Sequence, residues 1–75
     1  MNAITGQTFT MNQIINLKDV MQITGLSRAT IYNIINERHK QYDPTFPKQV
    51  HLTVGRVGWS AWQINQWIES KLANH

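Results

Sequence analysis

The feature that most constrains this chain is a pair of helix starts separated by a glycine, in the segment NLKDVMQITGLSRATIYNIINE. Asn16 can cap a first helix, with Asp19 in its first turn, and Ser27 can cap a second. Gly25 lies between them and suits the left-handed turn that commonly ends a helix. Two short helices joined by a turn of about three to four residues containing glycine are typical of a helix-turn-helix. The second helix of such a unit has a size and shape that fit the DNA major groove.

The neighbouring residues reinforce both helix starts and define the two faces of the second helix. Apolar pairs bracket the caps at the spacing of a hydrophobic staple, Ile15 with Val20 and Leu26 with Ile31. We therefore predict one helix over residues 17–24 and another over residues 28–38. At helical spacing, the buried stripe of the second helix would be Ile31, Ile34, Ile35 and the stem of Arg38.

The opposite face of the second helix is polar but uncharged, and it carries Ala29, Tyr32, Asn33 and Asn36. An asparagine amide can pair bidentately with adenine, so this face can be interpreted as a reader of DNA bases. The alternative is an ordinary solvated surface.

Composition narrows the class of protein. The chain has 75 residues, 41% of them hydrophobic, which predicts one small folded domain. It has no cysteine, so disulfides and thiolate metal sites are excluded. We find no signal peptide and no apolar run near the roughly 20 residues of a membrane span. We expect a flexible arm over residues 1–13, a domain over residues 14–73, and a cytoplasmic, nucleoid-associated protein that does not engage membranes.

The positive charge of the chain is concentrated in one stretch. The formal net charge is +3, and five of the seven cationic residues lie between the start of the second helix and residue 56: Arg28, Arg38, Lys40, Lys48 and Arg56. Only Glu37 and Asp43 oppose them within that stretch. A cationic zone of this kind favours contacts with phosphates, although it could also serve solubility alone.

The middle of the chain predicts a turn-rich connection followed by a β-hairpin. Residues 39–47 contain two prolines, and an alternation of apolar and polar residues follows. Gly55-Arg56 fits a two-residue type II′ turn, which would set Val54 opposite Val57 and Leu52 opposite Trp59. Arg56 would then lie at the hairpin tip, either near DNA or simply in solvent.

The last helix is predicted by Ser60 and Gln63, which form a capping box, and by Trp59 with Ile64, which form a staple. Its expected buried stripe is Ile64, Trp67, Ile68 and Leu72. Trp59 and Trp67 are interpreted as core residues. Trp62 lies off the stripe, so either the N-terminal arm covers it, through Phe9 for example, or it contacts another protein.

These segments together resemble a known family, the AlpA-type prophage regulators and related small excisionases, which share a MerR-like winged helix-turn-helix. The resemblance spans residues 17–72 and is carried by LKDVMQITGLSRATIYNII, FPKQV and GRVGWSAWQINQWIESKL. It implies a mainly α fold with a small β-hairpin, in the order α-α-β-β-α. It also implies sequence-specific binding to double-stranded DNA, either to activate transcription of an integrase gene or to steer recombination as an excisionase.

The resemblance also implies which residues contact DNA. Ser27, Arg28, Ala29, Tyr32 and Asn33 match recognition-helix positions, and Arg56 matches the wing tip. Asn36 and Lys48 complete the set of candidate DNA-binding residues, with Asn33 and Asn36 reading bases and the cations holding phosphates. Two departures from the family are the long connection ERHKQYDPTFPK and the presence of Trp62.

We expect no catalytic residues, metal site or cofactor. The chain has four carboxylates and three histidines, and they show no ligand or triad spacing. The expected partners besides DNA are further copies of the chain on adjacent sites and an integrase. The competing hypothesis is a protein-interaction module that binds and inhibits a regulator through the last helix and Trp62.

Overall fold

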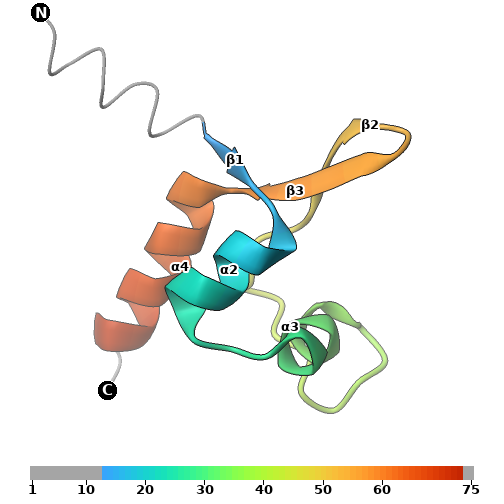
Figure 1. Ribbon diagram of the computed structural model, residues 1–75. Coiled ribbons are helices and arrows are strands. Elements are labelled where there is room, and N and C mark those ends of the chain that lie inside the picture. Colours follow the sequence, from blue (N-terminus) through green and yellow to red (C-terminus); the bar gives the residue numbers. More distant parts are fainter. Residues whose placement is uncertain (1–12, 74–75) are drawn as a thin grey trace, which may run out of the picture.

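The computed structural model describes residues 13–73, which form three helices and a small sheet (Figure 1). In chain order the elements are β1 (Ile14–Ile15), α2 (Leu17–Thr24), α3 (Arg28–Ile35), β2 (Val50–Thr53), β3 (Arg56–Ser60) and α4 (Ala61–Ala73). The strands are antiparallel in the order β1-β3-β2. This confirms the predicted winged helix-turn-helix class and adds a short strand before the first helix. Apart from Gln13, the predicted flexible arm lies outside the described residues, as does Phe9.

The predicted helix-turn-helix forms as the caps require. The Asn16 side chain accepts the Asp19 N–H at 2.8 Å, and the Asp19 carboxylate accepts the Asn16 N–H at 3.3 Å. Gly25 ends α2 in the left-handed region, with φ of 77°, and donates its N–H to the Met21 carbonyl. Ser27 begins α3 by accepting the Thr30 N–H. Both helix starts and the glycine turn are thus confirmed.

The second helix is shorter than the predicted range 28–38, because it ends at Ile35. Asn36 is the C-cap in an extended conformation, and its side-chain oxygen accepts the N–H of Arg38. Asparagine competes with helical hydrogen bonding in this way, which explains the early stop. Arg38 is therefore exposed in the connection, and the prediction that its stem extends the buried stripe is wrong.

The core lies where the helices meet the sheet. Its buried residues are Ile15, Val20, Ile31, Ile34, Phe46, Trp59 and Ile64. Ile35, Trp67 and Ile68 are partly buried against this cluster, so most of both predicted stripes is confirmed. Leu72 is 65% exposed, however, because it lies near the end of α4, past the part of the helix that contacts the core. Phe46 was not predicted as a core residue.

The hairpin forms, but the predicted register is wrong. Val50 pairs with Gly58, His51 with Val57 and Thr53 with Arg56, with an irregularity between His51 and Thr53. Trp59 pairs with Ile15 of β1 instead of Leu52. Because β1 takes the inner end of β3, the hairpin extends outward, and Leu52, Val54 and Val57 are exposed. Val54 and Gly55 form the tip, and Gly55 lacks the positive φ that glycine adopts in a type II′ turn.

Gly58 explains how β1 can approach β3 so closely. A Cβ atom at this position would lie 2.7 Å from both the Ile15 carbonyl oxygen and the Ile14 side chain. The Ala61 N–H, at the start of α4, donates to the Gln13 carbonyl, and Ser60 accepts the Gln63 N–H. The entry to β1 and the start of α4 are therefore held together.

Candidate nucleic-acid interface

The candidate interface is centred on the side of α3 that faces away from the core. Ile31 and Ile34 are buried beneath the helix and fix its rotation. Arg28 and Ala29 are exposed, Tyr32 is 45% exposed, and Asn33 is half-buried. The structure therefore brings four of the predicted site residues onto one short helix.

Ser27 is committed to beginning that helix. Its Oγ accepts the Thr30 N–H at 3.1 Å and donates to Thr30 Oγ1 at 2.9 Å. The hydroxyl proton is thus used within the cap. Arg28 is the first side chain of α3 that is free to extend toward a ligand.

The two asparagines do not share one helical face, contrary to the sequence prediction. Asn33 is in the last turn of α3 and donates its Nδ2 to Gln41 Oε1 at 3.2 Å. Asn36 lies past the helix end, where its Oδ1 accepts the Arg38 N–H at 3.0 Å. The prediction failed here because it assumed that the helix continued to residue 38.

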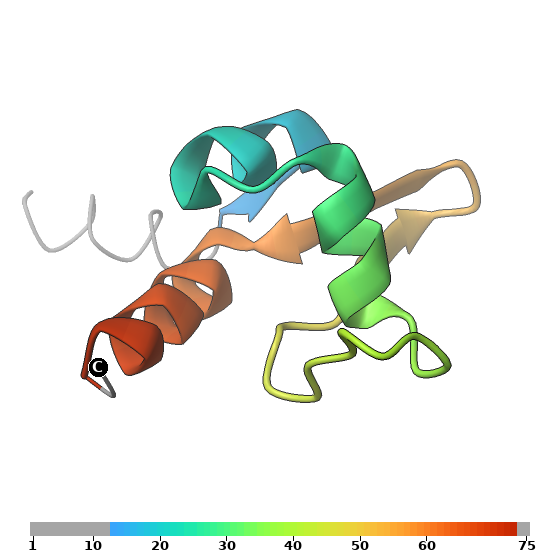
Figure 2. The same ribbon diagram turned by 90° about the horizontal axis from the view of Figure 1, so that it is seen from below.

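The two remaining predicted cations lie on other elements. Lys48 is exposed at the end of the connection, just before β2, and Arg56 is exposed as the first residue of β3. Arg56 is therefore not at the hairpin tip, where fully exposed Val54 lies instead. The hairpin and α3 both lie on the side of the molecule away from α4 (Figures 1 and 2).

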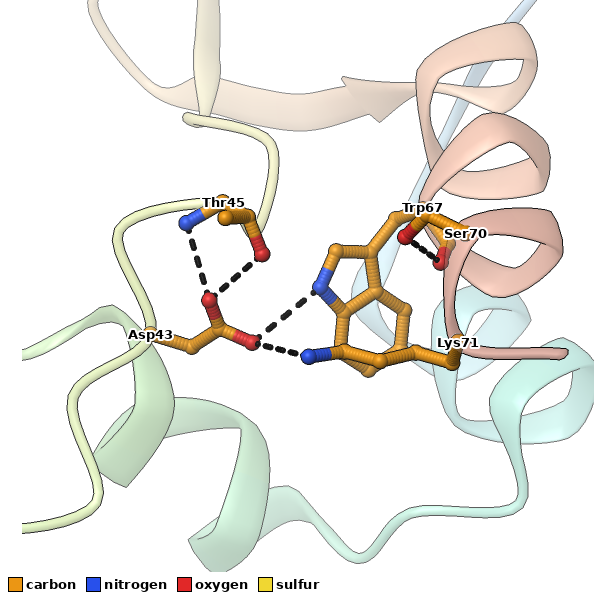
Figure 3. Close-up of polar contacts among 5 residues, drawn as sticks. All are labelled: Asp43, Thr45, Trp67, Ser70 and Lys71. Carbon is orange, nitrogen blue, oxygen red and sulfur yellow. Dashed lines mark hydrogen bonds and ion pairs between the residues drawn. The ribbon is translucent and has the colours of Figure 1, made fainter. Parts of the chain in front are cut away.

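The long connection between α3 and β2 is held in place by Asp43. One carboxylate oxygen accepts the Thr45 N–H at 2.8 Å and the Thr45 hydroxyl. The other accepts the Trp67 indole N–H at 3.3 Å and pairs with Lys71 Nζ at 3.0 Å, so the connection is joined to α4 (Figure 3). The Asp43 N–H donates to the Ile34 carbonyl at 2.8 Å. A single residue thus connects the end of α3 to the last helix.

Aromatic contacts strengthen the same junction. The Phe46 ring meets Trp67 edge to face, with centroids 4.9 Å apart and an interplanar angle of 80°. Lys71 Nζ lies 5.2 Å from the Trp67 ring centroid. Trp67 therefore belongs to the core edge, as predicted. Trp62 on the same helix is 43% exposed, in accordance with its place off the buried stripe.

Comparison with known proteins identifies the family. A family model described as "Prophage CP4-57 regulatory protein (AlpA)" matches residues 13–72, which is nearly the whole described domain. The chain belongs to the AlpA family. It is 42% identical over 59 residues to the "DNA-binding transcriptional activator AlpA" of Escherichia coli K12, covering 79% of this chain and 84% of that protein. The resemblance inferred from the motifs is confirmed.

A second relative comes from a phage. The uncharacterized protein ORF88 of Enterobacteria phage P4 is 31% identical over 64 residues, covering 85% of this chain and 66% of that protein. No solved structure matches the chain significantly.

The sequence did not identify three residues of this AlpA-family chain that position the site. All three lie in the long connection. Gln41 contacts Asn33, Asp43 joins α3 to α4, and Phe46 enters the core. The only available signal was that the connection is unusually long and ends in the Phe-Pro pair. Neither feature indicates which side chains fold back onto α3 and α4.

Two further properties concern residues 13–73 of this AlpA-family chain. They contain no group of three or more histidine, cysteine or acidic side chains that could hold a metal ion. Within the same range, none of the helices has both the length and the apolar character needed to cross a membrane.

The Asp43 junction predicts a pH-dependent stability. Partial burial of the Asp43 carboxyl raises its pKa, but hydrogen bonds from Thr45, Lys71 and Trp67 outweigh this and lower the pKa from 3.8 to about 2. The folded state thus binds this proton less readily than the unfolded state. The stability that this difference in pKa contributes is fully present above about pH 4 and is lost as the pH falls through about 2.

We expect Asp43→Asn to reduce the free energy of unfolding by about 1–2 kcal/mol at pH 7. The difference from the wild type should shrink below pH 4 and be small near pH 2. Urea titrations followed by circular dichroism at several pH values measure it. A difference that stays constant over this range would contradict the proposed role of the carboxylate charge.

Proposed function

We propose that this AlpA-family chain binds double-stranded DNA sequence-specifically and regulates transcription without catalysing a reaction. The observation that carries the proposal is the exposed side of α3, whose rotation is fixed by Ile31 and Ile34 beneath it. The E. coli relative, described as a DNA-binding transcriptional activator, supports the same function.

In the proposed complex, α3 enters the major groove and Asn33 is the main reader of bases. An asparagine can bind adenine bidentately, accepting from N6 and donating to N7. The Asn36 oxygen already accepts the Arg38 N–H, and Asn36 lies past the end of α3. We therefore place base readout at Asn33 and treat Asn36 as a secondary contact.

The remaining contacts would mainly hold the DNA backbone. Arg28 and Tyr32 extend from α3 itself, whereas Lys48 precedes β2 and Arg56 begins β3. Ala29, between Arg28 and the next turn, can contact a thymine methyl group. Ser27 would contribute through the start of α3 that it holds in place. Phosphate contacts set the register of a protein on DNA but carry no sequence information directly.

Asn33→Ala is expected to weaken binding to the cognate site by about 1–3 kcal/mol and to change binding to random DNA little. The reason is that only the cognate adenine offers both a donor for the amide oxygen and an acceptor for the amide N–H. Gel-shift titrations at several salt concentrations, with a site obtained by selection from random DNA, measure the effect.

Arg56→Ala is the matched control for this experiment. It should weaken binding to all sequences alike and reduce the salt slope by about one. If Asn33→Ala instead lowers cognate and random binding equally, base readout by Asn33 is wrong.

Within DNA binding, we propose that the protein activates an integrase gene, directs excision, or does both. A small domain covers little DNA, so we expect several copies on adjacent sites, in contact with an integrase. Measuring excision of the host element together with integrase transcript, with and without the gene, separates the roles. Excision that depends on the gene while the amount of integrase transcript stays unchanged favours the excisionase role.

The second candidate function is a protein-interaction module acting through α4. It is favoured by the exposure of Trp62, which adjoins exposed Asn65, Gln66 and Glu69 on α4. The Trp62→Ala variant distinguishes the candidates. Loss of regulation with unchanged DNA affinity would favour protein contact.

A further inference from the structure

The hydrogen bond between Asn33 and Gln41 links the proposed base reader to the long connection. Asn33 Nδ2 donates to Gln41 Oε1 at 3.2 Å, across eight residues of sequence. Asn33 is half-buried in the last turn of α3, and Gln41 is exposed. The contact therefore lies at the edge of the surface that would face DNA.

The backbone around Gln41 is held from both sides. The Gln41 N–H donates to His39 Nδ1 at 3.0 Å, and the Tyr42 N–H donates to the His39 carbonyl at 2.9 Å. The next residue, Asp43, donates its N–H to the Ile34 carbonyl and is joined to α4 through Trp67 and Lys71. These bonds return the connection to the end of α3 and keep the Gln41 side chain within reach of Asn33.

We propose that Gln41 is a positioning residue that sets the amide orientation of Asn33 for adenine. The inference rests on the proposed function. The Asn33 nitrogen carries two N–H groups, and the bond to Gln41 uses one of them. The other N–H and the amide oxygen remain, and they are the donor and acceptor that adenine N7 and N6 require. In the reversed orientation the Asn33 oxygen would face Gln41 Oε1, so the Gln41 amide would have to turn as well before the two side chains could bond again.

The orientation can be tested with side chains at position 41 that only accept or only donate. Gln41→Glu keeps an acceptor facing Asn33 Nδ2, so discrimination at the base read by Asn33 should be retained, although its charge weakens binding to all DNA. Gln41→Lys offers only donors and favours the reversed amide. It should strengthen binding to random DNA while lowering discrimination at that base about 2- to 10-fold.

The Asn33→Ala variant first identifies the one base pair at which it loses discrimination. The experiment then compares, for each variant, the Kd for the selected site with the Kd for the same site changed at that base pair. Gln66→Lys, at an exposed glutamine of α4, is the control for added charge and should leave that ratio unchanged. In an Asn33→Ala background, Gln41→Lys should cause no further loss at the same base. Thermal unfolding of each variant verifies the fold.

The outcomes separate this inference from the proposed function. If the wild type prefers no sequence, the proposed function itself fails. If the wild type discriminates and Gln41→Lys discriminates equally well, Gln41 does not position Asn33. Equal loss in Gln41→Glu and Gln41→Lys also overturns the inference, because the shape of the connection and not the acceptor would then matter.

Discussion

Gly58→Ala is expected to destabilise the domain by about 3 kcal/mol, because overpacking against backbone has no easy relief. The added Cβ would lie 2.7 Å from the Ile15 carbonyl oxygen, which is part of β1. To remove the clash, β1 must move off β3, and Ile15 would leave the core. A domain of this size rarely gains more than about 3–5 kcal/mol from its core, so a large unfolded fraction should be present. Urea unfolding followed by circular dichroism measures the loss.

Gly55→Ala provides the matched control. A Cβ at Gly55 meets no atom within 4 Å, and Gly25 is the sole glycine with positive φ among residues 13–73. We expect this variant to change the unfolding free energy by less than about 1 kcal/mol, with a slight gain possible from the stiffer unfolded chain. Equal losses at the two glycines would contradict the close β1–β3 packing.

Phe46→Ala is expected to cost about 3–5 kcal/mol, as is usual for removing a buried aromatic side chain. Phe46 is only 4% exposed and packs edge to face on Trp67. Its loss leaves a cavity between the connection and α4. Thermal unfolding gives the cost, and near-ultraviolet circular dichroism should show a change in the environment of Trp67.

Phe46→Leu retains most of the buried volume and should cost clearly less than Phe46→Ala. A loss below about 1 kcal/mol for Phe46→Ala would mean that the connection is not anchored through this ring. Such a result would also weaken the case for Gln41, whose position depends on the same connection.

The sequence predicted the local parts of the fold well, because their causes are local. Asn16, Gly25, Ser27 and Ser60 each form the cap or turn expected from their own chemistry. The hairpin register could not be predicted in the same way. It depends on β1 reaching Gly58 from more than 40 residues away in sequence, and alternation within the hairpin contains no information on that partner.

The candidate site was also predicted only where it depends on local pattern. The buried stripe of α3 predicted the exposed positions Ala29 and Tyr32, and the family resemblance added Arg28. The end of α3 was misplaced because an asparagine can lie within a helix or cap its end. Which of the two Asn36 does depends on the chain that follows. The contact of Gln41 with Asn33 depends on how the connection folds back, which no repeating pattern predicts.

The pairing of β1 with β3 has a consequence for synthesis of the chain. Residues 14–15 find their partners only at residues 59–60, and Ile64 completes the core around them. The helix pair α2–α3 therefore emerges from the ribosome well before the residues that cover its apolar side. The nascent chain should reach its proposed DNA-binding form only after α4 has begun to emerge, so ribosome-bound chains with only residues up to about 50 outside the exit tunnel should not yet recognise the site.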